Sequence, residues 1–145
     1  MTPSETHSTI RLGAMAIEFL VEPGDTAGAV SLFRCDLPAG SRVPAPHSHD
    51  AFDETAYGLS GTTRFTVGGV TTDLGPGEAL FIPRGVVHGF AVGDEDASVL
   101  FASTPGLFGP AYFSDMAEVL GAEGPPDLEA VFAVMRRHGL TPATA

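Results

Sequence analysis

The sequence has little positive charge. Its 145 residues include seven basic side chains against eighteen acidic ones, which gives a formal net charge of −11 at pH 7. All seven basic residues are arginines, and they are scattered apart from the neighbours Arg136 and Arg137. Binding to nucleic acid or to an anionic membrane surface needs clustered Lys and Arg side chains. The composition therefore argues against both classes of partner.

Cysteines and long apolar runs are also scarce. Cys35 is the only cysteine, so no disulfide can form within the chain, and its run S-L-F-R-C-D-L favours a small buried side chain. The N-terminal stretch has no basic segment followed by an apolar one, so no signal peptide is apparent. No apolar run approaches the roughly 18 residues that span a bilayer. These absences predict a soluble, cytoplasmic protein.

Turn signals and alternating apolar residues predict a single all-β domain. The hydrophobic content of 43% and charged content of 17% are values of a globular chain. Short segments of period two, separated by Gly- or Pro-bearing turns, are typical of an antiparallel sandwich or barrel. We expect a flexible tail over residues 1–9, a β-barrel over 10–104 and helices over 105–145. The expected strands span 11–21, 29–37, 55–59, 62–67, 70–74, 79–82, 88–92 and 98–103.

Two helices are predicted at the C-terminal end. Apolar residues recur at helical spacing from Pro110 to Leu120, with proline at the start and Gly121 as a stop. A second helix begins after Asp127, a suitable N-cap, and ends at Gly139. We expect this pair to form a short helical cap on the barrel.

Three of the five histidines lie in two short stretches of sequence. Residues 40–61 read G-S-R-V-P-A-P-H-S-H-D-A-F-D-E-T-A-Y-G-L-S-G and contain His47, His49 and Glu54. Residues 77–88 read G-E-A-L-F-I-P-R-G-V-V-H and end at His88. Side chains two positions apart lie on the same face of a strand, so His47 and His49 point the same way. Three imidazoles and a carboxylate that converge are typical of a transition-metal site rather than a calcium site.

These stretches resemble the paired motifs of the cupin superfamily. The first has the order Gly, His-x-His, Glu, Gly, and the second has the order Gly, Pro, Gly, His. The resemblance implies a jelly-roll β-barrel that binds one divalent transition metal. The ligands that it implies are His47, His49, Glu54 and His88. Fe, Mn, Ni, Cu, Co and Zn all remain open, because such a ligand set accepts each of them.

Two positions depart from the usual motifs, although neither changes a ligand. The gap between Gly40 and His47 is one residue longer, and Val92 replaces the Asn that often follows the last histidine. Asp53 is an alternative carboxylate, but a shift of one residue turns a side chain to the opposite face of a strand, which favours Glu54. A barrel that keeps these residues without a metal is the remaining alternative, and it would leave buried polar groups without partners.

A pocket for a flat apolar substrate is expected beside the metal. Small side chains share the face of Glu54, and larger apolar ones face them from the strands opposite. The C-terminal segment resembles that of small single-domain cupins related to quercetin dioxygenase, in which a helix lies near the pocket mouth. Tyr112, Phe113 and Met116 are then candidates to line that mouth. Packing in the core, or anchoring of the helix, is the alternative role for the aromatic members. The expected pocket residues are Ala56, Gly58, Thr63, Phe65, Phe90, Val92, Phe113 and Met116.

The resemblance implies a dioxygenase that acts on a small aromatic or enolic, flavonol-like compound, with metal-bound substrate and O2. Glu54 is then a candidate catalytic base as well as a ligand. A Lewis-acid isomerase, cyclase or lyase that does not use O2 is one alternative, and a non-catalytic small-molecule-binding cupin is another. The resemblance also implies a homodimer.

Overall fold

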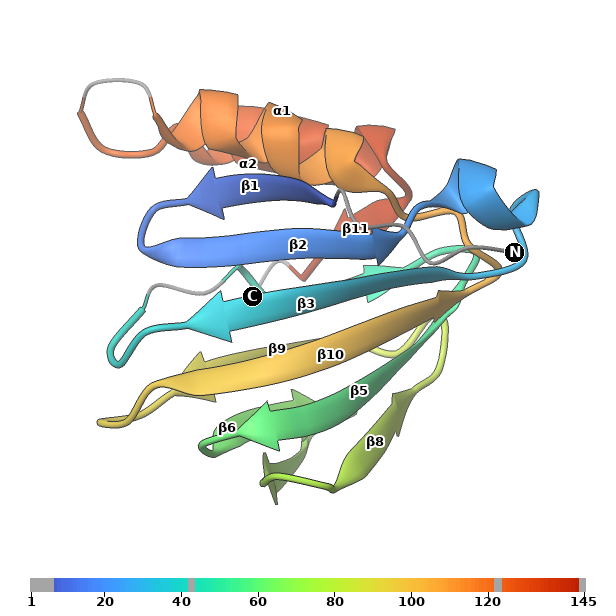
Figure 1. The fold of residues 1–145 in the computed structure, drawn as a ribbon. Coiled ribbons are helices and arrows are strands. Elements are labelled where there is room, and N and C mark those ends of the chain that lie inside the picture. The colour runs from blue at the N-terminus through green and yellow to red at the C-terminus, as the bar shows by residue number, and fades with distance from the viewer. Residues whose placement is uncertain (1–6, 42–43, 122–123, 144–145) are drawn as a thin grey trace.

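The computed structural model describes residues 7–41, 44–121 and 124–143, which form two antiparallel sheets and two helices (Figure 1). Sheet A has the strand order β1–β2–β3–β10–β5–β8, and sheet B has the order β11–β4–β9–β6–β7. The two sheets enclose one hydrophobic core. This arrangement confirms the predicted all-β jelly-roll class.

The strands of sheet A are β1 (Ser8–Leu12), β2 (Met15–Val21), β3 (Ser31–Leu37), β5 (Asp53–Ser60), β8 (Ala79–Ile82) and β10 (Ala97–Thr104). Those of sheet B are β4 (His47–His49), β6 (Thr63–Val67), β7 (Val70–Leu74), β9 (His88–Val92) and β11 (Leu140–Pro142). A 3₁₀ turn, η1 (Pro23–Thr26), follows β2. The helices are α1 (Pro110–Leu120) and α2 (Leu128–Arg137).

Side-chain alternation explains why these segments form strands. In β3, every second residue from Ser31 to Leu37 is buried and the residues between them are half-buried. The buried set includes Cys35, as expected. The β6–β7 hairpin turns at Gly68 and Gly69, whose φ angles are 55° and 82°. Both lie in the left-handed region that a two-residue hairpin turn requires and that glycine adopts without strain.

The N-terminal strand differs from the expectation. The segment 11–21 is two strands rather than one, because Gly13, with a φ of 61°, turns the chain between β1 and β2. Strand β1 begins at Ser8, which pairs with Phe19, so the expected tail over residues 1–9 is two residues too long at its inner end. The first six residues of that tail lie outside the described part of the chain.

The C-terminal region contains the two expected helices but does not end in helix. The carboxylate of Asp127 caps α2 by accepting hydrogen bonds from the amides of Glu129 and Ala130. After α2 the chain forms β11, where Leu140 pairs with His49 of β4. The prediction of helices over 105–145 missed this strand because three residues are too few to show a period. Residues 122–123 and 144–145 lie outside the described part.

The two helices pack against each other and on one edge strand of each sheet: α1 packs on β1 of sheet A, and α2 packs on β11 of sheet B (Figure 1). The α1 residues Phe113 and Met116 are buried in the core cluster. Among the described residues, no helix is both long and apolar enough to cross a bilayer.

Candidate metal centre

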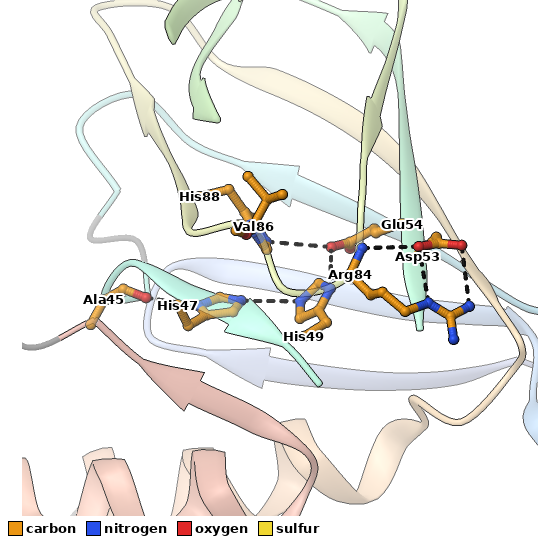
Figure 2. Close-up of polar contacts among 8 residues, drawn as sticks. All are labelled: Ala45, His47, His49, Asp53, Glu54, Arg84, Val86 and His88. Carbon is orange, nitrogen blue, oxygen red and sulfur yellow. Dashed lines mark hydrogen bonds and ion pairs between the residues drawn. The ribbon is translucent and has the colours of Figure 1, made fainter. Parts of the chain in front are cut away.

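Three strands from both sheets bring the predicted ligands together. Strand β4 carries His47 and His49, and the neighbouring strand β9 of sheet B carries His88 in register with His47. Strand β5 of sheet A supplies Glu54. One ring nitrogen from each histidine lies within 4.8 Å of the other two. Figure 2 shows Glu54 directed toward this group of histidines.

The spacing of the polar atoms suits a shared cation. Nε2 of His47 and Nε2 of His49 are 3.2 Å apart. Two nitrogens on adjacent positions of one ion, each about 2.1 Å from it, lie roughly 3.0–3.4 Å apart. Oε2 of Glu54 is 3.4 Å from Nδ1 of His49 and 3.7 Å from Nε2 of His88. The three imidazoles therefore surround one point, and the carboxylate of Glu54 lies beside two of them.

Backbone carbonyls fix two of the imidazoles. Nδ1 of His47 lies 2.8 Å from the carbonyl oxygen of Ala45, and Nδ1 of His88 lies 3.0 Å from that of Val86 (Figure 2). A carbonyl only accepts, so Nδ1 carries the proton in both rings and the neutral form leaves a lone pair on Nε2. Such bonds orient metal-binding histidines and set their tautomer.

Burial sets the charges of the same groups. Burial lowers the pKa of His47 to about 4 and, helped by His47 and His88, that of His49 to about 2. Burial also lowers the pKa of His88. It raises the pKa of Glu54 to about 8. The imidazoles are therefore neutral, as ligation requires, and the carboxylate needs a nearby cation to stay ionised.

One polar atom of the site has no partner. Nδ1 of His49 is buried and makes no hydrogen bond to the described protein atoms. Its ring stacks on Phe52 with centroids 4.3 Å apart. The set of three imidazoles, with a carboxylate oxygen 3.4 Å from Nδ1 of His49, fits a divalent transition metal.

The alternative carboxylate is engaged elsewhere. Asp53 points away from the histidines and accepts hydrogen bonds from Arg84, at 2.9 Å from its backbone nitrogen and 3.2 Å from both Nε and Nη2 (Figure 2). These hydrogen bonds lower the pKa of Asp53. The next residue, Gly85, donates to the carbonyl of His49 at 2.8 Å. The Asp53–Arg84 pair thus joins the start of β5 to the loop before His88.

An apolar cavity of about 50 Å³ adjoins the histidines. Of the eight expected pocket residues, Phe65, Phe90 and Phe113 line it. Gly58 does not, because it lies beneath the carbonyl of Gly75 in the turn between β7 and β8. The remaining expected residues are buried or half-buried in the barrel without lining the cavity: Ala56, Thr63, Val92 and Met116.

Several cavity residues were not expected from the sequence. Strands β2 and β3 contribute Met15, Ile17, Phe33 and Cys35, and their alternation was a usable signal. Burial raises the pKa of the Cys35 thiol, which therefore stays protonated. Tertiary packing brings the other unexpected residues to the cavity, and no period in the sequence indicated them: Pro44, Gly89, Phe101, Phe108 and Leu140. Tyr112, a candidate for the pocket mouth, also lines the cavity.

Comparison with known proteins agrees with this geometry. Residues 33–103 match a family model described as the Cupin domain. Quercetin 2,3-dioxygenase from Bacillus subtilis is 28% identical over 88 residues, which cover 61% of this chain and 26% of that protein. The chain thus spans about a quarter of the length of this curated relative.

Solved structures share the fold. An RmlC-like cupin from Shewanella frigidimarina superposes with a TM-score of 0.60 at 19% identity, over 72% of this chain and 89% of that one. Oxalate decarboxylase from Bacillus subtilis gives a TM-score of 0.64 at 20% identity, over 77% of this chain and 30% of that one.

Proposed function

We propose, from the match of residues 33–103 to the Cupin domain model, that the chain is a metal-dependent dioxygenase of a small aromatic or enolic compound. The observation that carries the proposal is the group of three histidines, His47, His49 and His88, at one side of an apolar cavity, with Glu54 beside two of them. The partial relationship to a quercetin 2,3-dioxygenase favours oxygen-dependent chemistry over the alternatives.

The four converging residues would hold one divalent transition metal. Oxalate decarboxylase, a protein with Mn(II) centres, has the same fold, so manganese is one candidate. A metal with open positions supplies Lewis-acid and redox chemistry toward an enol oxygen and O2.

The side chains of the chain itself perform three tasks in this proposal. Hydrogen bonds to Ala45 and Val86 hold two imidazoles in one orientation and one tautomer. The apolar walls exclude water, which strengthens electrostatic interactions inside the cavity. Oε2 of Glu54 lies beside the histidines and can accept the proton of a substrate hydroxyl, since burial raises the basicity of this carboxylate.

Oxygen uptake tests the proposal. Protein loaded separately with Fe, Mn, Ni, Cu, Co or Zn is placed in an oxygen electrode with catechols and flavonols, and His49→Ala is compared with the surface control His7→Ala. We expect substrate-dependent uptake with at least one redox-active metal, and its loss in His49→Ala only.

Two other results would replace the proposal. Turnover under nitrogen with zinc or nickel would assign a Lewis-acid isomerase, cyclase or lyase. Tight ligand binding without turnover under any metal would assign a non-catalytic binding cupin.

We also propose that the protein is a homodimer that pairs along β8. This strand is an edge of sheet A in the described part of the chain, and it exposes Phe81, with an exposed fraction of 55%. An open edge with apolar side chains favours pairing with another strand. Light scattering should give twice the monomer mass, and Phe81→Asp should give the monomer; a monomeric wild type would contradict the proposal.

A further inference from the structure

Tyr112 brings a hydroxyl group without a partner to the cavity. The side chain is only 2% exposed and lines the cavity. Its Oη makes no hydrogen bond to the described protein atoms. Buried hydroxyl groups nearly always have a partner, so an unpaired one calls for an explanation.

Other unpaired buried hydroxyls in the described residues lie elsewhere. Ser31, Thr63 and Ser103 also have buried oxygens without partners, but none of these residues lines the cavity. Among the unpaired atoms found, only Oη of Tyr112 and Nδ1 of His49 belong to cavity residues. The unsatisfied hydrogen-bonding capacity of the cavity is therefore concentrated at the metal centre and at Tyr112.

The ring of Tyr112 is held from several sides. It packs against Phe108 with centroids 4.8 Å apart, and edge-on against His138 with centroids 5.6 Å apart. Asp115 of α1 lies 2.7 Å from Nε2 of His138, which ties α1 to the end of α2. The hydroxyl is therefore pre-positioned, and an incoming ligand would not need to order it.

Tyr112 is a hydrogen-bond donor in this setting. Burial raises the pKa of its phenol, and the carboxylate of Glu54 raises it further. The hydroxyl therefore keeps its proton. The described lining residues include no Lys or Arg that would compete for an anionic group.

The size of the cavity limits the ligand. Its volume of about 50 Å³ is about three to five times what one water needs. This admits a molecule of one ring or a short chain, whereas the three-ring body of a flavonol would need the walls to move. The apolar lining favours an apolar body with few polar atoms.

We propose that Oη of Tyr112 donates a hydrogen bond to one oxygen of a compact substrate whose second oxygen faces His47, His49, Glu54 and His88. The substrate class is a catechol-sized ring or a short enol-ketone with two neighbouring oxygens. This inference rests on the proposed function, because it assumes that an oxygenated ligand enters the cavity.

Binding without turnover tests the inference. Zinc-loaded protein under nitrogen is titrated calorimetrically with catechol and with phenol, which lacks the second oxygen. Tyr112→Phe should weaken catechol binding about tenfold and leave phenol binding within about twofold. The matched control is Tyr57→Phe, which alters the exposed tyrosine and should leave both affinities unchanged.

A second measurement leaves Tyr112 intact. The sequence has two tyrosines, so Tyr57→Phe labelled with carbon-13 at the phenol carbon gives a single resonance, from Tyr112. We expect catechol to shift it far more than phenol. The inference is overturned if catechol and phenol shift the Tyr112 resonance equally, or if catechol does not bind to the wild type. It is also overturned if Tyr112→Phe leaves the catechol affinity unchanged, or weakens the binding of catechol and phenol equally. If only the dioxygenase proposal is wrong, the protein should still bind catechol in preference to phenol but should take up no oxygen.

Discussion

Glu54 and Asp53 are adjacent in the sequence but lie on opposite faces of β5. The first is 6% exposed beside the histidines, and the second pairs with Arg84 on the outside. A carboxylate within 4 Å of two imidazole nitrogens can share a cation with them, whereas one that already accepts three hydrogen bonds from an arginine cannot. The two residues should therefore respond differently to loss of charge.

The matched amides Glu54→Gln and Asp53→Asn separate these roles. We expect Glu54→Gln to lower the metal affinity at least about tenfold, because a neutral amide oxygen is a weaker ligand than a carboxylate. Asp53→Asn should bind metal nearly as tightly as the wild type and lose a little stability, since its ion pair with Arg84 is exposed. Competition with a chromogenic chelator measures both affinities, and equal weakening would contradict the assignment of Glu54 as the ligand.

The faces on which the candidate ligands lie were predictable from the sequence because a strand has a fixed period. His47 and His49 share a face at a spacing of two, and the same period separates Asp53 from Glu54. For Tyr112 the sequence offered only the resemblance of the C-terminal segment, which suggested a place at the pocket mouth or an anchor for the helix. The predicted apolar stripe of α1 contains Phe113 and Met116, and Tyr112 is buried because Phe108 and His138 pack on its ring. The burial of Tyr112 thus depends on where α2 ends, and the spacing of apolar residues within α1 carries no information about that position.

At the scale of elements, β5 and the turn between β7 and β8 approach each other at Gly58. The amide of Gly58 donates to the carbonyl of Glu78, and its carbonyl accepts from the amide of Gly77, both at 2.9 Å. A Cβ at this position would collide with the backbone of Gly75. Glycine is thus required here by backbone contact, and the sequence alone suggested a small pocket residue instead.

Gly58→Ala should therefore destabilise the protein by about 1–3 kcal/mol, because the added methyl group forces two backbone segments apart. Gly24→Ala is the control, since a Cβ there meets no atom within 4 Å. Urea unfolding, followed by circular dichroism, gives both free energies. Similar stability of the two variants would show that the turn can move away from β5 at little cost.

Sequence patterns predicted most of these elements but not all of them. Strands β3, β6 and β7 and both helices were predictable, since each has a period or a capping residue. Strand β11 was not, because its three residues become a strand only by pairing with β4. This pairing places Leu140 in the wall of the cavity, opposite His49 in register. The C-terminal segment thus completes the site through β11 as well as through α1.

At the scale of the whole molecule, the candidate metal centre takes side chains from both sheets. His47, His49 and His88 belong to sheet B, and Glu54 belongs to sheet A. Without a cation, burial disfavours the charged form of Glu54 and leaves Nδ1 of His49 unpaired. A bound ion would stabilise the ionised carboxylate and would link β4, β5 and β9. Metal binding should therefore be linked to folding of the entire barrel.

Removal of the metal should lower global stability by an amount that the metal concentration sets. At a free metal concentration of 100 times Kd, a site present only in the folded state adds about 2.7 kcal/mol to the free energy of unfolding. Chelator should abolish this gain in the wild type, and His49→Ala should show no gain with or without metal. Calorimetry across a metal titration measures both, with His7→Ala as the surface control. An equal rise in Tm for His49→Ala would place the stabilising ion elsewhere, for example on the exposed acidic surface, and would remove the support for a cation that joins the two sheets.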